Sequence, residues 1–121
     1  MKIMIVDDSD VVRSVVRKAL ALYGYIDVLE AVDGQDALDK ARSEQINIGL
    51  YVLDVNMPRM DGITLVQEIR KFNTTTPIIM LTTETDKSKM VLAKNYGATG
   101  WIIKPFDSEK FIKVVEMFLK K

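Results

Sequence analysis

The sequence predicts an α/β protein in which a doubly wound, five-stranded parallel sheet carries five helices. Short apolar runs alternate with longer helical patterns from one end of the chain to the other, as in successive βα units. The run over residues 48–53 is almost entirely apolar, which indicates a central strand buried on both faces. The run over residues 26–31 is interrupted by Asp27 and Glu30, which suits an edge strand better.

The first elements have clear boundary signals. Residues 3–6 form the first predicted strand, and residues 10–23 form the helix that follows. Ser9 can cap the start of this helix and Gly24 can end it. Its inner face is predicted to carry Val12, Val15, Val16, Ala19 and Leu20. The edge strand over residues 26–31 comes next.

The middle of the chain continues the alternation. Small and apolar residues at helical spacing predict a helix over residues 34–44, and the central strand follows it. Met57 and Pro58 break the pattern. Isoleucine, leucine and valine at helical spacing then predict a helix over residues 62–72.

The last third of the chain adds two more strand and helix pairs. Pro77 introduces a strand over residues 78–81, and a further strand is predicted over residues 99–103. The helix between them, over residues 86–96, has a poorly separated apolar face, so we expect it to be the least firmly held. An amphipathic helix over residues 108–119 completes the predicted fold.

The pattern of burial also predicts the order of the strands. If the second strand is an edge and the first is central, the order is 2-1-3-4-5, with right-handed crossovers and helices on both faces. The chain then leaves the first strand in opposite directions on its two sides. A crevice is expected outside the carboxyl ends of strands one and three, and function should be sought there.

Three aspartates are predicted to meet in this crevice. Asp7 and Asp8 end the first strand, and Asp54 ends the third. Three converging carboxylates require either a bound proton or a cation, and hard oxygen ligands suit Mg²⁺. For any single aspartate at a strand end, capping of the next segment is the simpler interpretation. Convergence of all three favours a metal site.

A lysine and two threonines are predicted to face the same space. Lys104 ends the fifth strand before Pro105, and this peptide bond can be cis at modest cost. Thr82 and Thr83 end the fourth strand and offer hydroxyl groups. Acids that gather a cation, opposed by a lysine and hydroxyl groups, suit phosphoryl transfer, and the Asp54 carboxylate is a competent acceptor.

The composition narrows the function further. The 121 residues include no His and no Cys, and 17 basic residues balance 17 acidic ones. No apolar run approaches the roughly 20 residues that cross a bilayer. We therefore expect one domain over residues 1–121, a cytoplasmic monomer that binds neither nucleic acid nor membrane.

Several short motifs follow one another along the chain: Val6-Asp7-Asp8-Ser9, Asp33-Gly34, Leu53-Asp54-Val55-Asn56-Met57-Pro58, Met60-Asp61-Gly62, Leu81-Thr82-Thr83-Glu84, Gly97-Ala98 and Lys104-Pro105-Phe106. In their order and spacing they resemble the receiver domains of two-component signalling, over essentially the whole chain. The resemblance implies a flavodoxin-like fold and supports the strand order 2-1-3-4-5. It also implies a phosphoacceptor that assists its own phosphorylation and dephosphorylation without being an enzyme in the usual sense.

The resemblance implies a role for each residue of the crevice. Asp54 would be phosphorylated by a histidine kinase. Mg²⁺ would be held by Asp8, by Asp7 mainly through water, by Asp54 and by the backbone carbonyl of Asn56. Lys104 would pair with the phosphoryl group.

The resemblance further implies a switch. Thr82 would follow the phosphoryl oxygen, and Trp101 would turn into the space that it leaves; the family usually has Tyr or Phe at that position. Thr83 stands where a small alanine is common, which narrows access to the site. Asn56 and Glu84 occupy positions that tune the lifetime of the phosphoryl group in the family.

The expected output is protein binding, because the chain ends with its last predicted helix and adds no DNA-reading part. Receivers use the fourth helix, fifth strand and fifth helix for output. The residues offered there are Lys87, Lys89, Met90, Lys94, Trp101, Phe106 and Lys113. Residues 97–106 look most like chemotaxis response regulators, which act on the flagellar motor switch, and a phosphatase is a further expected partner. Pairing with the kinase is expected to involve Val12 and Arg13.

Other functions remain open at this point. A phosphorelay intermediate, which passes the group to a His-containing phosphotransfer protein, is hardly separated from a chemotaxis regulator by the sequence. A Mg²⁺-dependent phosphohydrolase with an aspartyl-phosphate intermediate would need an acid two residues after Asp54, where this chain has Asn56. A flavin-binding module is rejected, because the first loop carries acids where a phosphate cradle needs Gly, Ser and Thr.

Overall fold

The computed structural model describes residues 1–44, 47–83 and 87–119. Strand and helix alternate along these ranges as β1 (Lys2–Val6), α1 (Asp10–Leu22), β2 (Val28–Ala31), α2 (Gly34–Glu44), β3 (Ile48–Asp54), α3 (Gly62–Arg70), β4 (Ile78–Thr82), α4 (Lys87–Asn95), β5 (Gly100–Ile103) and α5 (Ser108–Leu119). Within the described part of the chain, no helix is both long enough and apolar enough to span a bilayer.

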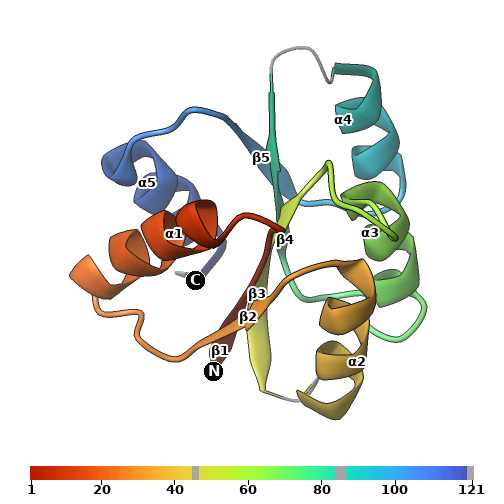
Figure 1. Ribbon diagram of the computed structural model, residues 1–121, viewed down its shortest axis with the longest axis horizontal. Coiled ribbons are helices and arrows are strands. Elements are labelled where there is room, and N and C mark those ends of the chain that lie inside the picture. Colours follow the sequence, from red (N-terminus) through yellow and green to blue (C-terminus); the bar gives the residue numbers. More distant parts are fainter. Residues whose placement is uncertain (45–46, 84–86, 120–121) are drawn as a thin grey trace.

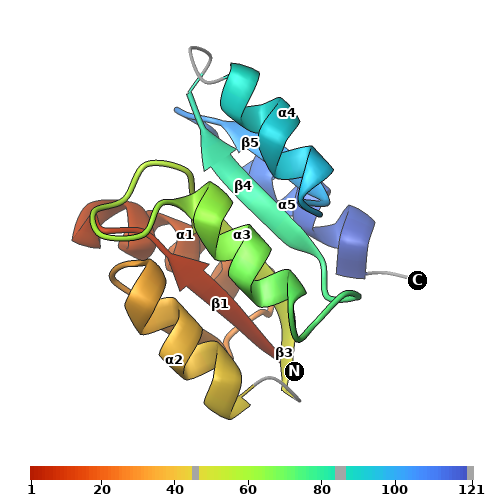
Figure 2. The ribbon, with the colours of Figure 1, turned by 90° about the vertical axis from the view of Figure 1, so that its right-hand side faces the viewer.

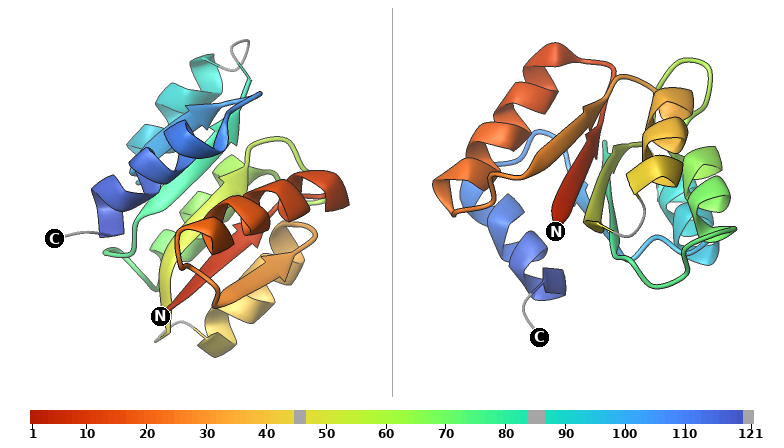
Figure 3. Two further views of the ribbon diagram at one scale, coloured as in Figure 1. Left: turned by 90° about the vertical axis from the view of Figure 1, so that its left-hand side faces the viewer. Right: turned by 90° about the horizontal axis from the view of Figure 1, so that it is seen from below.

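The strands form one parallel sheet in the order β2-β1-β3-β4-β5, as predicted. Helices α1 and α5 cover one face, and α2, α3 and α4 cover the other (Figure 1). The second group lies in front of the sheet in Figure 2. Figure 3 shows α1 and α5 side by side, with the N-terminus at the opposite end of β1 from the start of α1. The predicted doubly wound α/β fold is therefore confirmed.

Two apolar layers hold the helices to the sheet. On the side of α2 and α3, side chains of β1, β3 and β4 such as Met4, Tyr51 and Met80 are fully buried. On the side of α1 and α5, Phe111 and its neighbours pack against alternate residues of the same strands. The central strand β3 contributes to both layers, which explains its nearly unbroken apolar sequence.

Local signals set the ends of several helices where they were expected. The Ser9 side chain accepts a hydrogen bond from the backbone N–H of Val12 at 3.2 Å and so caps α1. Gly24 follows this helix with a φ of 90°, which glycine adopts without steric cost. Asp61 caps α3 in the same way through the N–H of Thr64, at 2.8 Å. The caps at Ser9 and Asp61 fix the starts of α1 and α3, which follow the carboxyl ends of β1 and β3.

Some predicted boundaries were wrong by a few residues. Strand β2 begins at Val28, because Ile26 is 80% exposed and precedes the pairing with β1. Helix α3 ends at Arg70 instead of residue 72, and the Asn73 side chain organises the turn that follows by accepting hydrogen bonds from two backbone N–H groups. Val15 was predicted to be internal but is exposed.

Helix α4 is the least embedded helix, as its sequence predicted. Among its described residues only Ala93 is buried, and Val91 and Leu92 face solvent. The predicted start at residue 86 lies outside the described residues. A helix with so small a buried face can be displaced at little cost in free energy.

Candidate functional site

The carboxyl ends of β1 and β3 bring three aspartates together. Asp7 and Asp8 directly follow β1, and Asp54 is the last residue of β3, the strand paired with β1. One carboxylate oxygen from each aspartate lies within 4.8 Å of the other two. Asp7 and Asp54 are buried, whereas Asp8 is exposed. The structure therefore brings the three predicted acids into one cluster.

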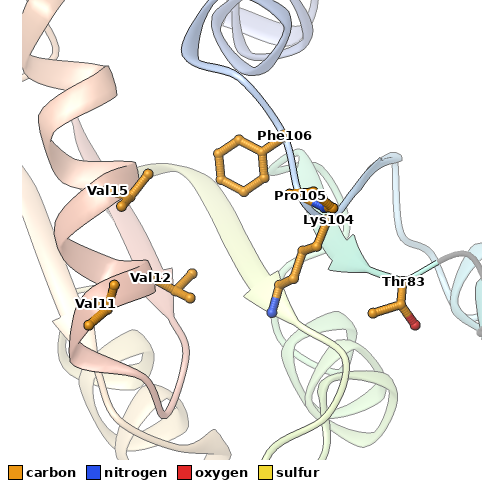
Figure 4. A pocket seen from close by; sticks show the side chains of 7 residues that line it. All are labelled: Val11, Val12, Val15, Thr83, Lys104, Pro105 and Phe106. Atoms are coloured by element: carbon orange, nitrogen blue, oxygen red, sulfur yellow. The ribbon is translucent and has the colours of Figure 1, made fainter.

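Lys104, which directly follows β5, brings a positive charge to the three aspartates. Its backbone N–H donates to the carbonyl of Thr82 at 2.6 Å, which fixes the point where the side chain begins. The ammonium Nζ then lies 2.8 Å from Asp54 Oδ1 and 3.4 Å from Asp7 Oδ2. The Lys104–Pro105 peptide bond is cis. Figure 4 shows the lysine side chain extending from the end of β5 towards the end of β3.

The surroundings of Asp54 stabilise its negative charge only in part. Burial raises the pKa of the Asp54 carboxyl, and the charge of Asp7 adds to this effect. The hydrogen bond and charge of Lys104, with a hydrogen bond from the backbone of Asn56, lower this pKa but do not cancel the rise. Burial also lowers the pKa of Lys104, but the hydrogen bond and charge of Asp54 outweigh it, so the lysine pKa is raised.

The donor atoms of the cluster suit a hard divalent cation. All three side chains offer carboxylate oxygens, which are the ligands that Mg²⁺ prefers over nitrogen or sulfur. Such a cation would offset the negative charge that Lys104 leaves uncompensated. The simpler capping role also holds for one member, because Asp7 Oδ1 accepts a hydrogen bond from the Ser9 N–H at 2.8 Å.

Thr82, the last residue of β4, and Thr83, which follows it, have different surroundings. Thr82 is buried, and its hydroxyl donates to the carbonyl of Thr83 at 3.3 Å. It follows Leu81, the residue paired with Asp54 across the sheet, and so lies next to the cluster. Thr83 is exposed and lines a surface hollow beside Lys104. Glu84 lies outside the described residues.

An apolar hollow of about 430 Å³ opens beside the acidic cluster. Its wall is formed by α1 on one side and by the segment after β5 on the other (Figure 4). The lining residues are Val11, Val12, Val15, Thr83, Lys104, Pro105 and Phe106. Val15 is exposed because it lines this hollow instead of the core. The hollow is therefore an exposed apolar surface that ends at Lys104, next to the acidic cluster.

Arg13 is turned inward and does not offer the recognition surface predicted for it. Its guanidinium is buried and donates to the backbone carbonyl of Asp7 at 2.6 Å and to Glu30 Oε1 at 3.0 Å, and it also pairs with Asp10. Burial raises the pKa of Glu30, but the hydrogen bonds and charges of Arg17 and Arg13 together outweigh this effect. The pKa of Glu30 is therefore lowered. Apart from Asp10, three residues before Arg13, no nearby residue indicates this network, which holds α1 against the end of β1.

The predicted output surface carries two hollows that meet at Trp101. Lys87, Met90, Lys94 and Trp101 line one hollow of about 520 Å³ with Val91 and Asn95. Phe106 does not line this hollow, but it shares a second hollow of about 440 Å³ with Trp101 and also lines the one beside α1. Its ring is 5.3 Å from that of Phe111. Lys113 is exposed on α5, and Lys89 is directed towards Asn56 instead of the output surface.

Comparison with known proteins gives consistent matches over almost the whole chain. The response regulator receiver domain family matches residues 3–116. Chemotaxis protein CheY1 of Helicobacter pylori strain J99 is 36% identical over 121 residues, which cover 98% of this chain and 97% of the relative. The probable transcriptional regulator ycf27 of Porphyridium aerugineum is 37% identical over 120 residues, but the match covers 48% of that relative.

Solved structures match to the same extent. The chemotaxis protein CheY4 of Vibrio cholerae has a TM-score of 0.85 and 41% identity, with 98% of each chain covered. The receiver domain of NtrX from Brucella abortus has a TM-score of 0.90 and 30% identity, again with 98% of each chain covered.

Proposed function

This chain belongs to the response regulator receiver domain family, and we propose that it accepts a phosphoryl group on Asp54 in a two-component signalling pathway. Receivers of this kind are phosphoacceptor switches and not classical enzymes. The observation that carries the proposal is the position of Asp54 between two other acids and the Lys104 ammonium, 2.8 Å away. We propose that residues 1–121 act as one receiver domain.

In the proposed transfer, a carboxylate oxygen of Asp54 attacks the phosphorus atom of a phosphohistidine on a histidine kinase. The P–O bond to Asp54 forms as the P–N bond breaks, and the histidine nitrogen leaves with the electron pair. Lys104 neutralises charge on the phosphoryl oxygens, and the hydroxyl of Thr82 donates to one of them. Positioning and charge neutralisation provide most of the catalysis in such transfers. The chain thereby assists its own phosphorylation and later hydrolysis.

We propose that Mg²⁺ is held by the side chains of Asp7, Asp8 and Asp54 and by the backbone carbonyl of Asn56. When bound, the ion neutralises negative charge on the acceptor and on the incoming phosphoryl group. Support comes from the three converging carboxylates, and from the burial and the Asp7 charge that together raise the pKa of Asp54. The apolar hollow next to Lys104 supports docking of the phosphodonor along α1.

We propose that the output is a change in protein binding at the hollow lined by Lys87, Met90, Lys94 and Trp101. In this scheme Thr82 moves with the phosphoryl group and Trp101 changes its orientation. Basic groups around an apolar hollow suit an acidic, amphipathic segment of a partner. The similarity to chemotaxis proteins of Helicobacter pylori and Vibrio cholerae favours a flagellar motor switch protein as that partner and a phosphatase as a regulator.

The central test is phosphorylation of the purified protein by a small acyl phosphate. Intact mass should show a gain of one phosphoryl group that requires Mg²⁺ and is absent in Asp54→Asn. Asp39→Asn, which changes an exposed acid of α2, should react like the wild type. No gain in the wild type, or an undiminished gain in Asp54→Asn, would contradict the proposal. Binding of a motor switch peptide that does not depend on phosphorylation would contradict the proposed output.

Asp54→Asn should also change thermal stability in a way that reveals the metal site. Because the folded-state pKa of Asp54 is raised, its ionised form destabilises the fold, and this cost grows as the pH rises through that pKa. The variant should therefore melt at a higher temperature than the wild type near pH 7 without Mg²⁺. Mg²⁺ at 100 times its Kd adds about 2.7 kcal/mol to the wild type, and much less to the variant. Calorimetry with and without Mg²⁺ measures both effects.

A further inference from the structure

One hydrogen bond joins helix α4 to the segment that follows Asp54. The Lys89 ammonium donates to Asn56 Oδ1 at 2.8 Å, across 33 positions of sequence. Asn56 lies two residues after Asp54, at the start of the connection between β3 and α3. The contact therefore links the helix of the proposed output surface to the loop of the acidic cluster.

Asn56 contacts Asp54 as well as α4. Its backbone N–H donates a hydrogen bond to the Asp54 carboxylate, and this bond lowers the pKa of that carboxyl. A backbone donor on one side and a side-chain acceptor on the other make Asn56 a bridge between Asp54 and Lys89. A movement of the Asn56 backbone changes both contacts together.

The rest of this connection is held independently of α4. Arg59 pairs with the buried carboxylate of Asp33, and the N–H of Gly62 donates to the Val55 carbonyl at 2.8 Å. Hydrogen bonding to Arg59 lowers the pKa of Asp33, so this ion pair persists at neutral pH. Lys89 thus holds the exposed Asn56 at the start of a segment in which Arg59 and Gly62 make separate contacts.

We propose that Lys89 is a positioning residue: by holding the Asn56 side chain, it fixes the backbone beside Asp54 and couples occupancy of the acidic site to the position of α4. The inference rests on the proposed function, because it takes the Asn56 carbonyl as a ligand of Mg²⁺. Since α4 buries little of its own surface, even an exposed hydrogen bond in its first turn can influence its position.

Lys89→Met tests whether Lys89 acts by positioning Asn56 or only by its charge, because the two roles predict opposite changes in the Kd for Mg²⁺. Loss of a positive charge near the site would by itself tighten Mg²⁺ binding. Loss of positioning should weaken it, by about two- to tenfold, the range that one such hydrogen bond supplies. Titration of the protein with magnesium chloride by calorimetry, without any phosphodonor, measures the Kd. Lys18→Met removes an exposed lysine from α1, and it should leave the Kd unchanged, as should Lys89→Arg.

Two further measurements separate the inference from simpler outcomes. In an Asn56→Ala background, Lys89→Met should no longer weaken Mg²⁺ binding, because only the effect of the lost charge remains. Mg²⁺ should slow amide exchange along α4 in the wild type, and much less so in Lys89→Met. An unchanged or tighter Kd in Lys89→Met, or the same slowing of exchange in both proteins, would overturn the inference alone. A wild type that binds no Mg²⁺ would overturn the proposed metal site with it.

Discussion

Gly62→Ala is expected to destabilise the folded protein by about 2–3 kcal/mol, although alanine is normally the better helix residue. Gly62 is the first residue of α3, and a Cβ atom at this position would lie 2.3 Å from the backbone oxygen of Asp54 and 3.0 Å from Met80 Cε. Backbone cannot yield as a flexible side chain can. Helix α3 must therefore move away from β3, which loosens its buried face. Chemical denaturation with the wild type in parallel measures the change.

Gly24→Ala provides the matched control. Gly24 has a φ of 90°, but no atom outside its neighbours lies within 4 Å of a Cβ built there. Its replacement should therefore cost only the backbone conformational term, about 1 kcal/mol. Gly62→Ala should also slow phosphorylation, because the displaced contact is with Asp54 itself, whereas Gly24→Ala should not. Equal stability of Gly62→Ala and the wild type would contradict the close packing of α3 against Asp54.

The sequence predicted the elements of the fold well because each had a local physical signal. Residues 108–119 form a helix with the predicted bounds, since the apolar positions repeat at helical spacing from its first turn to its last. The start of β2 was predicted two residues too early, because pairing with β1 depends on tertiary register and not on the apolar character of Ile26. Val15 was misplaced because helical spacing alone does not distinguish the core from an apolar hollow at the surface.

The acidic cluster was predictable for a topological reason. Residues at the carboxyl ends of adjacent parallel strands must meet, so the positions of Asp7, Asp8 and Asp54 at strand ends implied their convergence. The direction of long side chains was not predictable in the same way. Lys89 was expected on the output surface but reaches Asn56, and no feature of the sequence near either residue indicates the contact.

The inward direction of the Arg13 side chain could not be predicted from the sequence either. On a helix that starts next to the cluster, an arginine is equally compatible with an exposed recognition role and with an inward structural role. The inward role is set by Glu30 on β2, 17 residues away in the sequence, and by the backbone carbonyl of Asp7, which the turn before α1 brings under this helix. Prediction from sequence alone therefore reaches the cluster itself but not the network that holds its backbone.

Lys104→Met is expected to lower the stability of the metal-free protein and, at the same time, to tighten its binding of Mg²⁺. Without the ammonium, the buried carboxylates of Asp54 and Asp7 lose their nearest positive charge. Removal of one partner of a buried pair costs about 3–5 kcal/mol, and because 25% of the Lys104 side chain is exposed we expect about 1–3 kcal/mol. A divalent ion in the cluster no longer meets Coulomb repulsion from the lysine, so its Kd should fall by about tenfold or more.

The opposite signs make this variant informative. A variant that merely folds poorly would lose stability and bind Mg²⁺ more weakly, because its cluster would no longer be assembled. A variant that only removes charge should regain most of its lost stability when Mg²⁺ is added, since the ion replaces the missing compensation. Denaturation and calorimetric titration on the same sample measure the two quantities, with Lys18→Met as the control for loss of a surface charge. Weaker Mg²⁺ binding by Lys104→Met would show that the lysine organises the cluster, and that its charge does not compete with the metal.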